Sequence, residues 1–545
     1  MIISKLKKRF NMWSSLSALF VLLVLMPSIT IVYYLFQPAS ENWQHIKTYL
    51  LAEYFFNTVV TIGATGILTM FIGTSLAWIV TIYDFPLKKF LKWGLMLPLT
   101  IPAYIGAYTY YGIVNYTGVL QTTLRNVFDI RIDQQYVNIM SLQGVIFIFT
   151  LFLYPYVYTI TRSYFAKQSG ALIENARMLG KSPLQIFFQV VLPISRGAII
   201  GGVSLAVLEA LNDYGVVSYY GVPTFSTAIF KTWFGMGDVS SAIRLSAIVM
   251  VMVIVVLVGE KIYSRRRQYA STTTKVRPLK PIKLTGMKKA LVSGYVYIIF
   301  ALGFLIPSLQ LLHWSYLSRD RFDVVALSKM AANSFGTALI ASIGIIVASI
   351  IVANSKRISR SLITKVNAKI IVIGYSIPGS VIAIGIIIVF IALDRQLAPF
   401  YKSVLNIDKT LVLSSSIFML IVAYMIRFMA IGYNAVDAGF EKVGRRFYES
   451  SLLLGKSKLQ TFIKVDMPML KPALLSGVLI AFIDIMKELP LTLLLRPFNY
   501  DSLATKAFEY ANDEMIHEAS VPSLIIIGLS ILAMIIVDKL SRRGK

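Results

Sequence analysis

The chain of 545 residues contains no cysteine and few charged residues. Without cysteine it can form no disulfide, no thiolate metal site and no cysteine nucleophile. Charged residues make up 14% of the sequence, whereas a soluble protein carries about 25%. Because a charge in the hydrocarbon core of a bilayer is costly, this deficit and a hydrophobic content of 57% predict a polytopic membrane protein.

Acidic residues and histidines are also scarce. The 26 acidic residues face 53 basic ones, a formal net charge of +27, which would suggest nucleic acid as the partner of a soluble protein. Here the basic residues concentrate in short loops between apolar runs, as membrane topology requires, so we expect no nucleic-acid partner. The histidines His45, His313 and His517 lie far apart in sequence and make a poor metal cluster, so we interpret them as polar loop residues.

Apolar runs long enough to cross a bilayer, about 20 residues each, occur twelve times. The first follows four basic residues, like a signal peptide, but it is too long and lacks a convincing cleavage site, so we expect an uncleaved helix. The predicted spans are residues 13–36, 54–82, 93–116, 141–161, 197–216, 241–262, 289–312, 334–355, 369–393, 410–433, 472–493 and 521–540. The expected fold is an all-α membrane protein with twelve transmembrane helices.

Lysine and arginine set the expected orientation, because loops on the cytoplasmic side are enriched in them. With twelve spans, the basic segments all fall on one side, so that side and both termini are predicted to be cytoplasmic. These segments are Lys5 to Arg9, Lys88/Lys89/Lys92, Arg265–Arg267 with the following stretch to Lys289, Lys356/Arg357/Arg360, and Lys539/Arg542/Arg543/Lys545.

The stretch 263–288 is polar, basic and contains two prolines, which is typical of a linker. We therefore expect a first half at residues 1–262, a cytoplasmic linker at 263–288 and a second half at 289–545.

Two predicted cytoplasmic loops repeat each other. ENARMLGKSPLQIFFQVVLPISRGA begins at Glu174, and ESSLLLGKSKLQTFIKVDMPMLKPA begins at Glu449, with matching positions 275 residues apart and no gap. Glu174/Glu449, Gly180/Gly455 and Pro193/Pro468 recur in register, which indicates a duplication. Each unit holds six spans, an even number, so the halves form parallel repeats about an axis along the membrane normal.

The two GKS triplets do not form a nucleotide-binding loop. Such a loop needs G-x-x-x-x-G-K-[ST], but Asn175 and Ser450 stand five positions before Gly180 and Gly455. We therefore expect that this chain does not bind ATP through that motif and that it carries no cofactor.

Each repeated loop predicts a helix, a break and a second helix. Gly180 can take the left-handed conformation that ends a helix containing Glu174 and Ala176, and Pro183 suits the first turn of the next. The second helix, about 183–191, is amphipathic, with Leu184, Phe187, Phe188 and Val191 at three- and four-residue steps. It either lies on its own protein or docks into a partner's groove, and two copies at symmetric positions favour docking on a dimeric partner. Leu459 and Phe462 are its counterparts in the second loop.

Acidic pairs follow both loops inside predicted spans. Glu209 and Asp213 are four residues apart, on one face of the fifth span, and adding 275 gives Asp484 and Glu488 in the eleventh. One interpretation is an oxygen-rich lining for a cation, because hard ions favour such ligands. The other is that these groups pair internally, for example with Lys487, or lie at hydrated helix ends.

The repeated motif resembles the EAA loop of ABC-importer permeases, E-A-A-x-x-x-G followed by I-x-L-P. Glu174, Gly180 and Leu192-Pro193 match it, as do Glu449, Gly455 and Met467-Pro468, while Ser450 and Ser451 replace the two alanines. The resemblance covers nearly the whole chain and implies an inner-membrane permease with two coupling loops, at about 163–197 and 434–471. It also implies a homodimer of ABC ATPase subunits seated on these loops, and an extracytoplasmic binding protein that delivers the substrate.

A narrower resemblance concerns the substrate. Leu208-Glu209-Ala210-Leu211-Asn212-Asp213-Tyr214-Gly215 and Lys487-Glu488-Leu489-Pro490, running into Leu493–Pro497, are similar to fused iron(III)-type permeases. Fused thiamine and phosphonate permeases are close relatives and stay as alternatives.

Two other classes remain for comparison. An ion-driven secondary transporter would not need paired cytoplasmic loops, and it often uses broken helices at the membrane midplane. A membrane enzyme would need a catalytic cluster, whereas the acidic pairs lack a partnered nucleophile.

Overall fold

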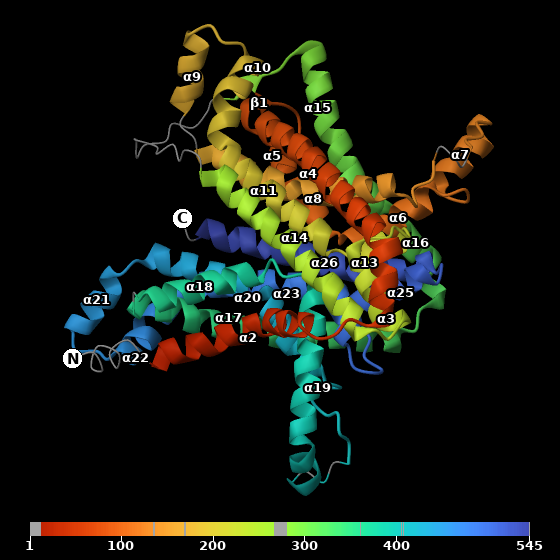
Figure 1. The fold of residues 1–545 in the computed structure, drawn as a ribbon. Coiled ribbons are helices and arrows are strands. Elements are labelled where there is room, and N and C mark those ends of the chain that lie inside the picture. The colour runs from red at the N-terminus through yellow and green to blue at the C-terminus, as the bar shows by residue number, and fades with distance from the viewer. Residues whose placement is uncertain are drawn as a thin grey trace.

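The computed structural model describes residues 12–133, 137–167, 170–265, 281–359, 361–404, 406 and 408–543. Long helices make up most of these residues (Figure 1). Extended structure is confined there to one parallel pair of two-residue strands, β1 (Tyr83–Asp84) and β2 (Ile282–Lys283). The prediction of an all-α membrane protein is confirmed. Helices dominate because a bilayer offers the backbone no hydrogen-bond partner, and a helix satisfies its own groups.

Short 3-10 and π-helical turns, labelled η, join the α-helices. The first half contains α2 (Met12–Leu35), α3 (Glu41–His45), η1 (Ile46–Leu50), α4 (Leu51–Ile82), α5 (Lys88–Gly94), η2 (Leu97–Thr100), α6 (Ala103–Val114), α7 (Val119–Phe128), α8 (Leu142–Lys167), α9 (Gly170–Met178), α10 (Pro183–Ile186), η4 (Phe187–Val191), α11 (Leu192–Asn212), α12 (Gly215–Tyr219), α13 (Phe225–Phe230), η5 (Lys231–Gly235) and α14 (Val239–Arg265).

The second half follows the same order. It contains α15 (Gly286–Phe300), η6 (Ala301–Leu305), α16 (Ile306–Leu317), η7 (Arg319–Arg321), α17 (Val324–Ser359), α18 (Leu362–Gly374), α19 (Gly379–Val404), α20 (Ile417–Val443), α21 (Arg446–Leu453), α22 (Lys458–Thr461), η8 (Phe462–Asp466), α23 (Met467–Met486), α24 (Pro490–Leu495), α25 (Leu503–Asn512) and α26 (Ile516–Arg543).

Within the described ranges, eleven helices are long and apolar enough to cross a membrane, and one bent pair brings the number to twelve. The bent pair, Lys88–Thr100 with Ala103–Phe128, turns by 93° and replaces the continuous helix predicted at 93–116. The span predicted at 369–393 is broken as well, between α18 and α19. The tenth span begins at Ile417 instead of residue 410, because residues before it form a loop whose Leu413 and Ser414 amides donate to Asp394.

Proline explains both broken spans. Pro102 precedes α6 and Pro378 precedes α19, and each carbonyl accepts the first hydrogen bonds of the helix that follows. A proline lacks the N–H that would continue a preceding helix and clashes with its last turn, so the earlier segment ends before it.

The helix contacts recur in both halves. α4 packs on α8 and α11, as α17 packs on α20 and α23, and α11 packs on α14 as α23 packs on α26. This agreement is the structural form of the parallel repeat.

The first span of each half lies against the other half. α2 packs on α17, α18 and α19, and in turn α16 packs on α6 while η6 contacts α8. Trp13 at the start of α2 also stacks edge-on with Phe462, 5.5 Å between ring centroids. Because the first helix of each half packs on the other half, the two repeats cannot separate as independent domains.

The predicted linker lies partly outside the described residues, as do Lys5 to Arg9 and Lys545. Its last part forms β2, which pairs with β1 at the end of α4 through Tyr83–Ile282 and Asp84–Lys283. The end of the linker is therefore fixed to the first half.

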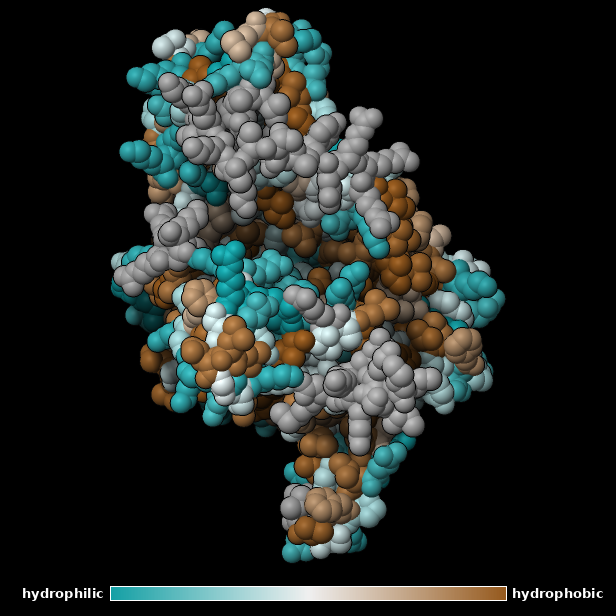
Figure 2. Space-filling model, turned by 90° about the vertical axis from the view of Figure 1, so that its left-hand side faces the viewer, coloured by the Kyte–Doolittle hydropathy of each residue, from teal (hydrophilic) through white to brown (hydrophobic). Residues whose placement is uncertain are grey.

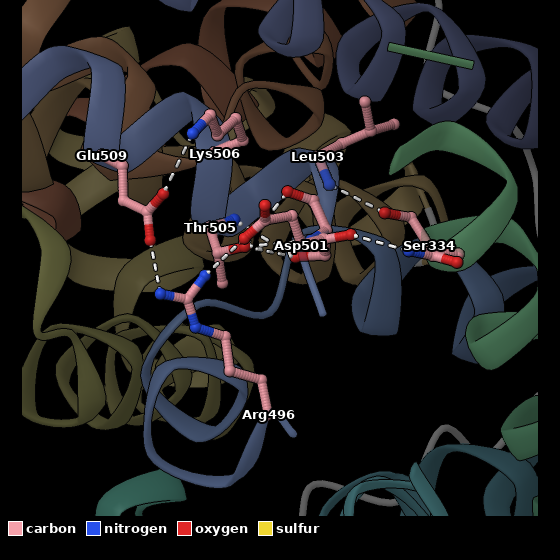
Figure 3. A network of polar contacts seen from close by, with 9 residues as sticks. Ser334, Arg496, Asp501, Leu503, Thr505, Lys506 and Glu509 are labelled. Atoms are coloured by element: carbon pink, nitrogen blue, oxygen red, sulfur yellow. Dashed lines mark hydrogen bonds and ion pairs between the residues drawn. The ribbon is translucent and has the colours of Figure 1, made fainter. Parts of the chain in front are cut away.

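An ion network closes the segment after α24 (Figure 3). Arg496 pairs with Asp501 at 2.9 Å and with Glu509 at 2.5 Å, and Ser334 accepts a hydrogen bond from the Leu503 amide at 2.8 Å. Among the described residues of the first half, no ion pair holds the equivalent segment; there Thr58 accepts a hydrogen bond from the Phe225 amide at 3.2 Å. Both contacts fix the short helices of this segment against the second span of their half.

Hydrophobic side chains reach the surface over much of the face in Figure 2. On α17 the exposed ones follow helical spacing, at Phe335, Leu339, Ile343 and Val347. Such a stripe on a helix that could span a membrane is suited to lipid.

Close packing between α4 and α8 depends on Gly73. A Cβ added there would lie 2.6 Å from the Val157 Cβ and 2.9 Å from the Tyr158 amide, whereas nothing lies within 4 Å of one added at Gly63 on the same helix. Gly73→Leu should lower the melting temperature of the detergent-solubilised protein by several degrees, since overpacking costs about 1–3 kcal/mol. The matched Gly63→Leu should leave it nearly unchanged. Equal melting temperatures for the two variants would contradict this packing.

Candidate functional site

A cavity of about 110 Å³ lies at the junction of the two halves. All five residues predicted for a translocation path line it: Glu209, Asp213, Asp484, Lys487 and Glu488. The rest of its wall is Leu99, Ile101, Pro102, Ala103, Tyr104, Phe149, Phe152, Leu153, Tyr156, Asn212, Tyr375, Arg427, Phe428, Leu489 and Pro490. The duplication therefore brings four carboxylates from two distant parts of the sequence into one site.

Each acidic pair marks the end of a helix. Glu209 lies on α11 and Asp484 on α23, but Asp213 and Glu488 lie just beyond the last residues of these helices. The predicted spans 197–216 and 472–493 therefore each cross a break, and the second acid of each pair is not on the helix face that the spacing predicted. Asp213 accepts from the Val216 amide at 2.8 Å and Glu488 from the Leu491 amide at 3.2 Å. These carboxylates satisfy amides of the helices that follow, α12 and α24.

Cations neutralise the carboxylates of the second half. Lys487 Nζ lies 2.7 Å from Asp484 Oδ1, as the internal-pairing interpretation expected, and Arg427 Nε lies 3.2 Å from Glu488 Oε2. Arg427 and Glu488 are both more than nine-tenths buried. Removing one partner of such a pair costs roughly 3–5 kcal/mol, because the other charge stays buried.

Sequence reasoning missed Arg427, Tyr375 and Asn212, whereas Tyr104, Tyr108, Tyr110 and Tyr111 of the third span could be interpreted equally as cavity lining or as aromatic packing. Arg427 projects from α20, and Tyr375 at the end of α18 donates a hydrogen bond to Glu209 Oε1 at 2.7 Å. Tyr104 and Asn212 also line the cavity. The signal for Arg427 was present, since an arginine inside a membrane span is a functional candidate by default.

Other tyrosines of the third span serve packing. Tyr108 donates to the Ala519 carbonyl at 3.2 Å and hydrogen-bonds Ser523, and Tyr110 donates to the Leu302 carbonyl. Tyr111 packs edge-on against Tyr219 at 5.8 Å. Only Tyr104 of the four tyrosines lines the cavity among the described residues.

The part of the chain that the structure describes contains no group of three or more histidine, aspartate or glutamate side chains placed to hold one metal ion. The cavity carboxylates are therefore spread along a wall and do not form a preassembled chelate. The interpretation of the three histidines as loop residues is wrong, because His45 ends α3, His313 lies in α16 and His517 lies in the first turn of α26, against the ring of Trp314 with centroids 5.8 Å apart.

The two repeated loops share one backbone motif. Gly180 has φ +76° and Gly455 has φ +79°, the left-handed conformation predicted for them. The amides of Gly180 and Lys181 donate to the carbonyls of Arg177 and Ala176, and the second loop repeats this pattern. This hydrogen-bond pair is a Schellman cap, which ends the helix at a fixed angle.

Serine begins the next helix in both loops. Ser182 and Gln185 form a reciprocal capping box, as do Ser457 and Gln460, with Pro183 as the first helical residue in the first loop. The helix then runs on through a π-helical turn into the span, Pro183–Asn212 in the first half and Lys458–Met486 in the second. The predicted amphipathic helix 183–191 is therefore the beginning of the fifth span. Pro193 and Pro468 lie within these continuous helices.

The apolar residues of the loops divide into a buried and an exposed set. Ala176 and Val191 are buried, and Phe187 packs on Trp78 at 5.3 Å, just as Phe462 packs on Trp13. The single apolar face predicted from Leu184, Phe187, Phe188 and Val191 is therefore wrong. The exposed set occurs twice, 275 residues apart: Met178, Leu179, Leu184 and Phe188, then Leu453, Leu454, Leu459 and Ile463. Glu174 is half-buried and Glu449 exposed near these two patches.

Comparison with known proteins decides the class. Residues 325–544 match the family described as binding-protein-dependent transport system inner membrane component. Over 495 residues the chain is 24% identical to the Fe(3+)-transport system permease protein FbpB 2 of Haemophilus influenzae, covering 90% of both chains. The chain is an ABC-importer permease. It is a multi-pass protein of the inner membrane, as the resemblance implied.

Other relatives match part of the permease. The sulfate transport system permease protein CysT of Salmonella typhimurium is 27% identical over 38% of this chain and 74% of its own length. The spermidine/putrescine transport system permease protein PotB of Haemophilus influenzae is 26% identical over 35% of this chain and 65% of its own.

Broken helices do not separate the two transporter classes considered from the sequence. The permease has them in the third span of each half, beside the cavity, at Pro102 and Pro378. The family match makes it a transport subunit of the ABC class, and the ion-coupled alternative is no longer needed.

Proposed function

We propose that this permease imports iron(III), which an extracytoplasmic binding protein delivers, and that ATP hydrolysis on a separate subunit drives the import. The observation that carries the proposal is the relative named for Fe(3+) transport, which aligns over 90% of both chains. The relatives named for sulfate and for spermidine/putrescine align over less than two-fifths of this chain.

The charge of the cavity supports a cationic substrate. Four carboxylates and two cations line it, so carboxylates are in excess. A sulfate dianion would be repelled by that excess, whereas hard cations favour oxygen ligands. Because the carboxylates form no preassembled chelate, an ion would bind weakly enough to leave, as a conducting site requires.

We further propose that residues 263–288 link two permease halves, 1–262 and 289–545, and that the side carrying both repeated loops is cytoplasmic. α9 and α10 lie well apart from α21 and α22, so the loops offer two separate docking points (Figure 1). Helix α5, which carries Lys88, Lys89 and Lys92, contributes Leu91 to the buried cluster that contains Ala176 and Ile186 of the first loop, in keeping with the enrichment of basic residues on cytoplasmic sides.

Each loop would dock on one subunit of a homodimeric ATPase that binds ATP and magnesium. Met178, Leu179, Leu184 and Phe188 are each at least 60% exposed, and their second-loop counterparts are each at least 55% exposed. An apolar patch that recurs on a symmetric pair of loops suits a groove present twice on a dimer. Because Pro183–Asn212 is one helix from docking patch to cavity, a displacement of the patch would reach the cavity directly.

The left-handed glycines provide a test of the docking. Gly180→Val and Gly455→Val should each lower co-purification of the ATPase and abolish uptake, because valine in this conformation costs about 1–3 kcal/mol and would misalign the cap. Gly180→Asn and Gly455→Asn are matched controls, since asparagine tolerates positive φ, and they should stay near wild type. Membrane insertion should be normal in all four. Valine variants that co-purify with the ATPase and transport at the wild-type rate would refute the docking.

Substrate identity can be tested by uptake into cells that express the permease with its ATPase and binding protein. Radioactive iron(III) should accumulate, and the double variant Glu209→Gln/Asp484→Asn should lose most of this uptake while still co-purifying with the ATPase. The same cells should be offered thiamine, a phosphonate, sulfate and spermidine. Uptake of one of these four solutes, with no uptake of iron, would show that this solute is the substrate instead. Normal iron uptake by the double variant would show that the cavity is not part of the translocation path.

A further inference from the structure

We infer that the substrate cation is held by one half of the cavity, the first-half subsite of Glu209, Asp213, Asn212 and Tyr104. This subsite rests on the proposed function, because that proposal identifies iron(III) as the transported cation. The carboxylates of the second half, Asp484 and Glu488, are instead occupied by the permease's own cations.

The duplication supplies the comparison between the two halves. Glu209 corresponds to Asp484 and Asp213 to Glu488, and α8 and α20 begin at Leu142 and Ile417, also 275 residues apart. At this spacing Arg427 corresponds to Phe152, and Lys487 corresponds to Asn212. The acids are therefore present in both halves, whereas the cations occur in the second half alone.

The contacts follow the same division. Asp484 and Glu488 have ion-pair partners at 2.7 Å and 3.2 Å. Across the described ranges, no lysine or arginine forms an ion pair with Glu209 or Asp213. Glu209 receives one hydrogen bond from Tyr375, and Asp213 receives one from the Val216 amide. A carboxylate has about four lone-pair positions, so both keep acceptor capacity that faces the cavity.

Two buried oxygens in the same half have no partner. Tyr104 is 3% exposed and Asn212 is 7% exposed, and both line the cavity. Neither the Tyr104 hydroxyl nor Asn212 Oδ1 makes a hydrogen bond to any described residue. Buried polar atoms normally have a hydrogen-bond partner. Two buried oxygens without one, beside two carboxylates without an ion-pair partner, therefore indicate a place for a ligand. All four groups present oxygen, the donor that hard cations prefer.

The cations near the cavity agree with this difference between the two halves. Arg427 lies within electrostatic reach of Glu209 and Asp484 as well as Glu488, and it is held towards Glu488 by the ion pair. A cation entering on the first-half side therefore meets two carboxylates without an ion-pair partner among the described residues, whereas Arg427 and Lys487 are each paired with a second-half carboxylate. Repulsion from Arg427 and Lys487 would also keep the cation from binding too tightly to leave.

Terbium(III) luminescence tests the subsite without transport. Tb³⁺ is a trivalent hard cation whose emission is sensitised by nearby tyrosines, and Tyr104, Tyr156 and Tyr375 line the cavity. Purified permease in nanodiscs should show saturable Tb³⁺ emission. Glu209→Gln and Asp213→Asn should each weaken it about tenfold or more, because each removes a charge from the ion's surroundings while keeping the acceptor for Tyr375 or Val216.

The matched control removes a whole ion pair from the second half. Asp484→Asn/Lys487→Gln leaves the net charge unchanged and should alter Tb³⁺ affinity by about twofold at most. Phe152→Arg places a cation in the first half at the position equivalent to Arg427, and it should abolish the emission although every acid is intact. This variant decides the matter even if a first-half acid variant folds poorly.

Loss of affinity in the paired control equal to that in Glu209→Gln, or full affinity in Phe152→Arg, would overturn the subsite. Iron uptake by the wild type together with unchanged Tb³⁺ binding in both first-half variants would overturn the subsite and leave the iron assignment standing. The expected Tb³⁺ pattern in a permease that takes up no iron would support the subsite and overturn the iron assignment.

Discussion

A backbone amide freed by a break in a membrane helix must find its partner within the protein, and the centre of this permease is built around that constraint. α11 ends at Asn212 and α23 at Met486, and the carboxylates of Asp213 and Glu488 accept the amides of Val216 and Leu491. The amides at each break need a hydrogen-bond acceptor, and both acceptors are carboxylates. Because a carboxylate is costly in contact with lipid, both must lie between the two halves of the protein. The acids of the cavity therefore complete the fold and line the candidate path at once.

The same helices connect this cavity to the two repeated loops. A helix of 30 residues, Pro183–Asn212, spans about 45 Å at 1.5 Å per residue, and it leads from the exposed loop patch to Glu209 without a break. The Schellman cap at Gly180 fixes the angle between this helix and α9. Because α2 and α16 are exchanged between the halves, movement of one half is also transmitted to the other. The exposed loop patches and the cavity thus lie on the same continuous helices.

Local signals in the sequence predicted local features well. Glycine before Lys-Ser predicted the left-handed turns, and the 275-residue repeat located Asp484 and Glu488 from Glu209 and Asp213. Features that depend on tertiary packing were missed. Loop hydrophobicity could not show that Phe187 packs on Trp78 while Phe188 stays exposed, and an apolar run of 25 residues concealed the break before Pro378. The partner of Arg427 lies 61 residues away in sequence, so only the fold reveals the ion pair.

Four carboxylates and two cations line the cavity at the junction of the halves, and the resulting excess of negative charge can be measured directly. The chain has no native cysteine, so one placed at Ala103, a half-buried cavity residue, can be modified selectively. The measurement is the rate at which Ala103→Cys reacts with a cationic and an anionic methanethiosulfonate, relative to Thr117→Cys on an exposed loop. The cationic reagent should be favoured at Ala103→Cys by about tenfold over the exposed site, because surplus carboxylates concentrate cations. Equal ratios at the two sites, or a preference for the anionic reagent at Ala103→Cys, would contradict it.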